Sequence, residues 1–158
     1  MHLNRIALAS IATLMLLAPA AQALQAGKTA QQRDYVSGGI SREELDQLAQ
    51  MKARYTLHLL TAAKGSGAHL AGVKVSIVDD RGQPVLATEM DGPWLYVDLA
   101  PGRYRIEANF EGQVERRQTQ IAPTGRRQLI IYFASDAEVS PDLIDERAGA
   151  KPEVPAGR

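Results

Sequence analysis

Strict alternation of apolar and polar side chains over residues 103–111 is the feature that most constrains this chain. The apolar members of this run are Tyr104, Ile106, Ala108 and Phe110. A period of two is typical of a β-strand that has one buried and one solvated face. Pro101-Gly102 precedes the run and Gly112 follows it, and both suit tight chain reversals. The run therefore predicts a strand of a β-sandwich.

Turn-forming Gly, Pro and Asp residues recur along residues 54–134, and no helical segment separates the apolar runs. We predict seven short strands at residues 55–61, 73–77, 85–90, 94–99, 103–111, 114–121 and 129–134. Seven short strands without helical crossovers indicate an all-β, antiparallel sandwich of two sheets. The last strand is apolar on both faces, so we expect it to be central in its sheet or covered by a helix.

A short amphipathic helix is predicted within residues 35–53, after a short strand or loop. Ser41 and Glu44 have the spacing of a capping box, and Leu45, Leu48 and Met51 recur at helical intervals. We expect this helix to cover one edge or end of the sandwich. Residues 24–34 lack periodicity and are predicted to be a flexible lead, and the polar residues 135–158 are predicted to be a disordered tail.

The N-terminal residues 1–23 have the pattern of a secretory signal peptide. Residues 6–18 are almost wholly apolar, and Ala21-Gln22-Ala23 matches the small-x-small cleavage pattern, so we predict cleavage after Ala23. A membrane anchor is the alternative, but this run is short for the roughly 30 Å hydrocarbon core of a bilayer. We therefore expect an exported protein whose mature chain does not insert into the membrane.

Composition excludes several classes of site. The chain has no cysteine, so neither a disulfide framework nor a thiolate metal site can form. Lysine plus arginine equal aspartate plus glutamate at 18 each, and no basic face emerges, so we predict no nucleic-acid partner.

Several turn and strand motifs together resemble the carboxypeptidase regulatory-like domain over about residues 55–133. They are the alternating Val73, Val75 and Ile77, then Asp79 and Gly82, then Asp91-Gly92, and finally Pro101-Gly102-Arg103-Tyr104 with Ile106 and Ala108. The resemblance implies a transthyretin-like sandwich, related to the B-type repeats of bacterial adhesins and to carbohydrate-binding-like folds. The whole arrangement also resembles a set of small exported proteins of Gram-negative bacteria. This resemblance implies a periplasmic location, but it does not indicate any activity.

The resemblance does not bring a peptidase site with it. The regulatory-like domain is the non-catalytic partner in such carboxypeptidases, and the His-x-x-Glu zinc pair of the catalytic domain has no counterpart at His58 or His69. Ser66 lacks the Gly-x-Ser-x-Gly frame of a serine hydrolase. We predict no catalytic residues, no metal and no cofactor.

The aromatic side chains of residues 94–99 are the candidate ligand-binding residues. If Leu95, Val97 and Leu99 face the core, Trp94 and Tyr96 stand on the outer face beside Asp98, and Tyr132 could extend the surface. Flat rings with a neighbouring acceptor suit the stacking of a sugar. The alternative is that Trp94 closes one end of the sandwich and Tyr96 packs under the N-terminal helix.

Two functions follow from this pattern. The first is a non-catalytic periplasmic binding or accessory module that engages an envelope protein through a sheet face or edge. The second is binding of a carbohydrate or cell-wall glycan through the aromatic face.

Four arginines on the predicted strands 103–111 and 114–121 are interleaved with glutamates. They are Arg103, Arg105, Arg116 and Arg117, and the pattern predicts cross-strand charge pairs on a solvated hairpin.

Overall fold

The computed structural model describes residues 24–134, and the predicted signal peptide and tail lie outside them. These residues form nine strands, one α-helix and one short 3-10 helix. The strands are β1 Gln25–Lys28, β2 Asp34–Gly38, β3 Leu57–Ala63, β4 Lys74–Asp79, β5 Pro84–Glu89, β6 Trp94–Val97, β7 Gly102–Phe110, β8 Gln113–Ile121 and β9 Arg127–Phe133. The helices are α1 Arg42–Met51 and η1 Lys52–Arg54.

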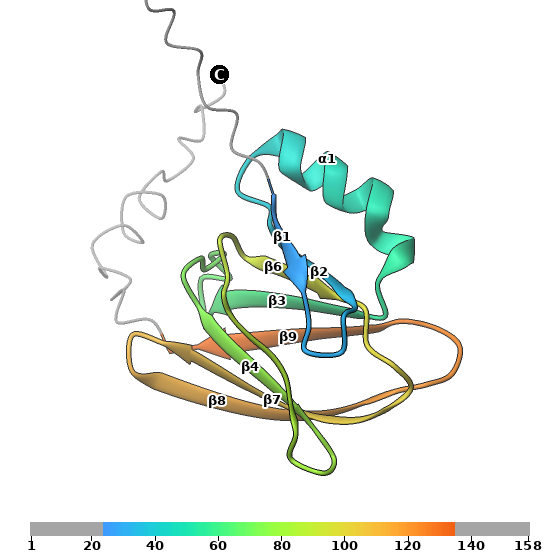
Figure 1. Cartoon of the computed structure of the whole chain (residues 1–158). Helices are drawn as coiled ribbons and strands as arrows, with labels where there is room; N and C mark the ends of the chain where they lie inside the picture. Colours follow the sequence, from blue (N-terminus) through green and yellow to red (C-terminus); the bar gives the residue numbers. More distant parts are fainter. Residues whose placement is uncertain (1–23, 135–158) are drawn as a thin grey trace, which may run out of the picture.

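The strands form two sheets, which face each other as a sandwich (Figure 1). One sheet has five strands in the order β1-β2-β6-β3-β9, and the other has four in the order β5-β4-β7-β8. The predicted two-sheet β architecture is thus confirmed, and the seven predicted strands correspond to β3 through β9. The predicted count of seven was too low, because β1 and β2 add two strands. The predicted flexible lead over residues 24–34 was wrong, because Gln25–Lys28 pairs with β2 in an antiparallel ladder.

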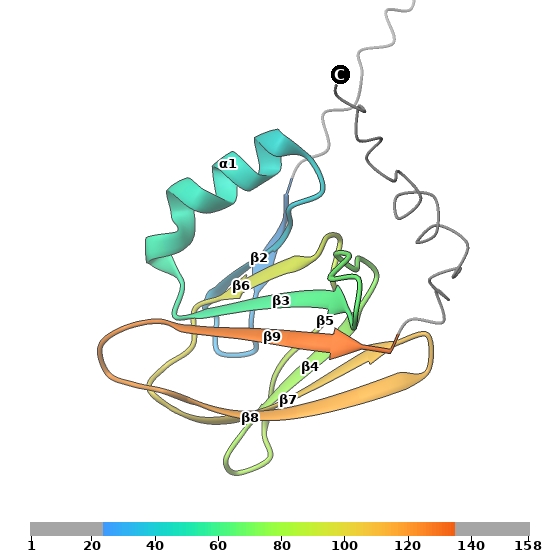
Figure 2. The same ribbon diagram turned by 180° about the vertical axis from the view of Figure 1, so that it is seen from behind.

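One pairing departs from the predicted antiparallel arrangement. Strand β9 runs parallel to β3, with Leu59 opposite Leu129 and Ala63 opposite Phe133. The reason is that β8 belongs to the opposite sheet, so the loop before Arg127 carries the chain from one layer to the other (Figure 2). Alternation reveals which face of a strand is buried but carries no information on strand direction.

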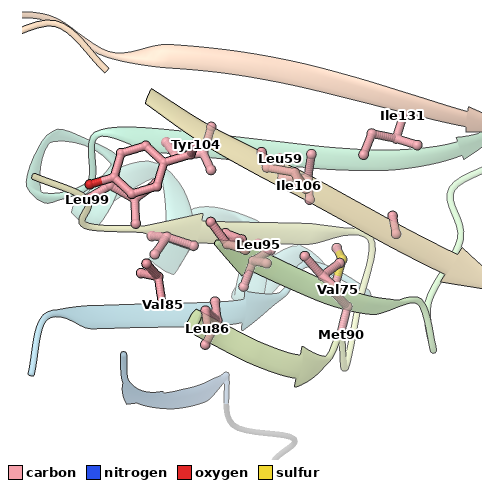
Figure 3. Close-up of a cluster of buried hydrophobic side chains, with 14 of the residues drawn as sticks. Leu59, Val75, Val85, Leu86, Met90, Leu95, Leu99, Tyr104, Ile106 and Ile131 are labelled. Atoms are coloured by element: carbon pink, nitrogen blue, oxygen red, sulfur yellow. The ribbon is translucent and has the colours of Figure 1, made fainter. Parts of the chain in front are cut away.

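The main core fills the space between the two sheets (Figure 3). Tyr104 and Ile106 of β7 point toward Leu59, Leu95 and other side chains of the opposite sheet, as their alternation predicts. Burying each large apolar side chain stabilises the fold by about 1.5–3 kcal/mol. This layer is therefore the principal source of stability.

Helix α1 covers part of the outer face of the five-stranded sheet (Figures 1 and 2). It forms as the capping box predicts: the Ser41 hydroxyl accepts a hydrogen bond from the Glu44 amide at 3.1 Å. The Glu44 carboxylate is buried and accepts hydrogen bonds from the Gly39 and Ile40 amides, each at 2.8 Å. A second core of Val36, Leu48, Tyr55 and Tyr96 lies between this helix and the sheet.

The end of β2, just before helix α1, contacts the turn that precedes β6. The buried Ser37 hydroxyl accepts a hydrogen bond from the Asp91 amide at 3.0 Å. A Cβ atom on Gly92 would lie 2.8 Å from the Gly38 Cα atom and closer still to its carbonyl group. Gly39 has a φ of +93°, and a Cβ atom there would lie 2.7 Å from a ring carbon of Trp94. Gly92 is required by the close approach of the Gly38 backbone, and Gly39 by its positive φ and its contact with the Trp94 ring.

Within residues 24–134, no helix has both the length and the apolar character needed to cross a bilayer.

Candidate binding surface

Trp94 and Tyr96 lie on the outer face of the five-stranded sheet, as predicted, but the predicted aromatic platform is wrong. Tyr96 is only 4% exposed because it packs in the second core with Leu48 and Met51 of α1 and with Tyr55. Its ring packs against His58 at a centroid distance of 4.3 Å and against Trp94 at 5.8 Å. Burial also raises the pKa of the Tyr96 hydroxyl. The alternative, in which Tyr96 packs under the N-terminal helix, is the observed arrangement.

The other two predicted ligand residues do not join this pair. Asp98 lies beyond the end of β6, where its carboxylate forms an ion pair with Arg33 at 2.9 Å. Tyr132 is 46% exposed on β9, and the whole of β3 separates it from β6. The structure therefore distributes Trp94, Asp98 and Tyr132 over three different environments, and they do not make one sugar site.

His58 is a buried part of the helix-sheet junction. Its Nε2 atom lies 3.0 Å from the carbonyl oxygen of Lys52 in η1. Burial lowers the pKa of His58 below its ordinary value of 6.5, and the nearby charges of Lys52 and Arg126 act in the same direction. His69 lies in an exposed loop, and no group of three or more His, Asp or Glu side chains within residues 24–134 is arranged to hold a metal ion.

Because the pKa of His58 is lowered in the folded state, the unfolded chain binds more protons below 6.5. The contribution of neutral His58 to the free energy of unfolding should be fully present above pH 6.5 and be lost as the pH falls through the folded-state pKa of His58. We expect urea unfolding midpoints to decrease over this range in the natural chain and to decrease less in His58→Phe, which keeps the ring contact with Tyr96. His69→Gln is the matched control, and an unchanged pH dependence in His58→Phe would contradict the assignment.

The exposed surface that the sequence analysis missed lies along β9. We expected residues 129–134 to be central or covered, but β9 is an edge strand whose outer side chains Ile130 and Tyr132 are 39% and 46% exposed. The apolar character of both faces was the available signal. That pattern predicts burial of both faces within the chain, but the structure leaves one of them open.

Backbone groups also point outward along β9. The Arg127 amide donates to the Thr56 carbonyl and the Phe133 carbonyl accepts from the Lys64 amide, both at 2.7 Å. In a parallel ladder, alternate residues direct their amide and carbonyl groups to the same side. Gln128, Ile130 and Tyr132 therefore direct theirs away from β3. We call these three residues the β9 edge.

The other three sheet edges are protected against pairing. Strand β1 has only four residues, and β8 carries a charged run at Glu115, Arg116 and Arg117. Strand β5 begins with Pro84, and the Ala30 amide already donates to the Val85 carbonyl. Short length, charge, proline and covering loops are the usual devices that block edge pairing. The β9 edge has no charged side chain from Gln128 to Phe133 and lacks these devices.

An apolar strip continues from the β9 edge toward the helix. Ile130 is opposite Leu60 in the ladder, and Leu60 is opposite Trp94 on the next strand. Leu60 and Trp94 are half-buried, while Leu45 on α1 is 41% exposed. The strip offers apolar contact next to unpaired backbone groups, which is the combination that an added strand requires.

No protein-family model and no curated protein matches this chain. The kinship to carboxypeptidase regulatory-like domains therefore stays a prediction from its motifs.

Proposed function

We propose that this chain is a non-catalytic binding module of the bacterial periplasm, which holds an extended segment of an envelope protein along the β9 edge. The observation that carries the proposal is an edge strand that is uncharged from Gln128 to Phe133 and whose exposed residues present both backbone groups and apolar side chains. Added strands obtain affinity from backbone hydrogen bonds and specificity from alternate side chains. Export is supported by the signal-peptide pattern of residues 1–23.

The surface defines the chemistry of the partner. Alternate residues of the added strand would lie beside Ile130 and Tyr132 on the outer face, so they should be apolar. Arg126 and Arg127 flank one end of the edge, and neither forms an ion pair within residues 24–134. A carboxylate on the partner would complement them. The expected partner is an extended, alternately apolar segment with an acidic residue at that end.

We also propose that the sandwich is transthyretin-like. Support comes from the position of the motif residues in the fold: Pro101 immediately precedes β7, and the turn of Asp79 and Gly82 joins β4 to β5. A glycan site on the aromatic face has no comparable support, because Tyr96 is buried.

Site-specific photo-crosslinking in cells tests the proposed partner site. A photoreactive aromatic residue in place of Tyr132 should give one defined adduct with an envelope protein, and Ile130→Lys should abolish it, because a lysine on the edge opposes strand addition. Ile130 is partly exposed, so its replacement should leave the unfolding midpoint nearly unchanged. The adduct should map to an extended segment of the partner.

Val114 provides the matched control. Its side chain is 38% exposed, and it lies on a charged strand of the other sheet. The same photoreactive residue at this position should give no such adduct. Equal adducts from the two positions, or an adduct that survives Ile130→Lys, would contradict a site on β9.

A further inference from the structure

The outer face of the four-stranded sheet is open, because α1 lies on the other side of the molecule (Figures 1 and 2). The side chains of Arg103, Arg105, Glu107 and Asn109 on β7 alternate with the buried residues of the same strand and so face outward. This face is polar, and it belongs to the sheet that does not contain β9.

Two of its arginines lack a carboxylate partner. Arg116 forms the predicted cross-strand pair with Glu107 at 2.8 Å, and Arg117 pairs with Glu115 of its own strand at 2.9 Å. Arg103 and Arg105 form no ion pair with any residue of the described part of the chain. Among the described residues, the predicted cross-strand pairing is found for Arg116 and was wrong for Arg103, Arg105 and Arg117.

Glutamine amides stand beside these two arginines in place of carboxylates. Gln120 is opposite Arg103 in the ladder, and Gln118 is opposite Arg105. These four side chains and Asp80 line a hollow of about 480 Å³, which we call the arginine hollow. The two arginines are two residues apart on one strand, so their backbones are separated by roughly 7 Å along it.

A second hollow continues the first across the sheet. It has a volume of about 430 Å³ and shares Arg105 and Gln118 with the arginine hollow, and it extends to Ser76 and Glu107. Together the two hollows form an elongated depression over β4, β7 and β8, and the lining of the second also includes Val78 and Ile106. A chain-like ligand would fit this shape better than a compact one.

The chemistry of the lining selects the ligand. Guanidinium groups bind carboxylates through paired, charge-assisted hydrogen bonds. Glutamine amides both donate and accept, so they match hydroxyl groups, and the Asp80 carboxylate can accept from a hydroxyl but repels an anion. The projecting side chains around the hollow are polar or charged, whereas peptide recognition relies on apolar pockets for alternate side chains.

We propose that the arginine hollow binds an acidic polysaccharide, with sugar carboxylates on Arg103 and Arg105 and sugar hydroxyls on Gln118 and Gln120. The site is independent of the β9 edge, since it lies on the opposite sheet, and each function can fail without the other.

Calorimetric titration of the full chain with polygalacturonate tests the site. We expect binding that weakens as salt is added, and an affinity at least about tenfold lower in the double variant Arg103→Gln/Arg105→Gln, which removes charge-assisted hydrogen bonds. Both side chains are exposed, so the unfolding midpoint of the variant should match that of the natural chain. The β9 crosslink should persist in this variant.

Three controls define the specificity. Arg42→Gln/Arg54→Gln removes the same charge from exposed positions on the helical side and should bind polygalacturonate as the natural chain does. Neutral dextran should not bind, and poly-glutamate should bind more weakly than polygalacturonate. Absence of polygalacturonate binding, equal losses in the two double variants, or equal affinity for dextran or poly-glutamate would each overturn the proposal.

Discussion

Gly92→Ala is expected to lower the free energy of unfolding by about 3 kcal/mol, the upper end of the usual range for inserting an atom into a packed site. The new methyl group would meet the backbone of Gly38, which cannot rotate away as a side chain can. Because Gly38 is paired with Trp94, relieving the clash requires β2 and β6 to separate. Urea unfolding followed by the fluorescence of Trp94, the only tryptophan, measures the change.

Gly67→Ala is the matched control for this substitution. Gly67 has a φ of +71°, and a Cβ atom there would meet nothing within 4 Å. It should therefore carry only the cost of a left-handed backbone, about 1 kcal/mol. Equal losses in the two variants would mean that the contact between Gly92 and Gly38 does not limit stability.

Glu44→Ala should cost about 3 kcal/mol, because it leaves the Gly39 and Ile40 amides without their acceptor in a largely buried position. The start of α1 would loosen, and Trp94 and Tyr96 beneath it would become accessible to water. Hydrogen exchange at the Gly39 and Ile40 amides should accelerate, and the urea midpoint should fall.

Two further variants separate the role of Glu44 as a hydrogen-bond acceptor from the effect of its charge and from the helix cap at Ser41. Glu44→Gln keeps a carbonyl oxygen in the same place and should recover most of the lost stability. Ser41→Ala removes only the bond to the Glu44 amide and should cost about 1 kcal/mol. If Glu44→Gln were as unstable as Glu44→Ala, hydrogen bonding to Gly39 and Ile40 would not be the source of the effect.

Local patterns predicted most of the fold. The alternation around Ile106 identified which side chains fill the core, and the spacing of Ser41 and Glu44 located the start of the helix. Strand β1 escaped prediction because Gln25–Lys28 contributes little buried apolar surface and depends on pairing with β2. A strand that is held mainly by backbone pairing with its neighbour carries no periodic pattern of apolar side chains.

The candidate site was harder to predict, because exposure depends on what lies over a residue. Tyr96 does point away from the main core, as its alternation with Leu95 and Val97 requires. Alternation cannot show that α1 returns to cover that face. The opposite holds for Ile130. Its strand is apolar on both faces, which predicts that Ile130 is covered, but the side chain is exposed.

The parallel ladder of β3 and β9 has a consequence for how the molecule assembles. It joins Leu59, in the first half of the chain, to Leu129, close to the end of the described residues. Contacts between residues so far apart in sequence carry a high loop-closure entropy and form late. Until β9 pairs with it, β3 is itself the edge strand of the sheet. During folding, the backbone groups of β3 should therefore be exposed at the side of the sheet that β9 covers in the folded protein.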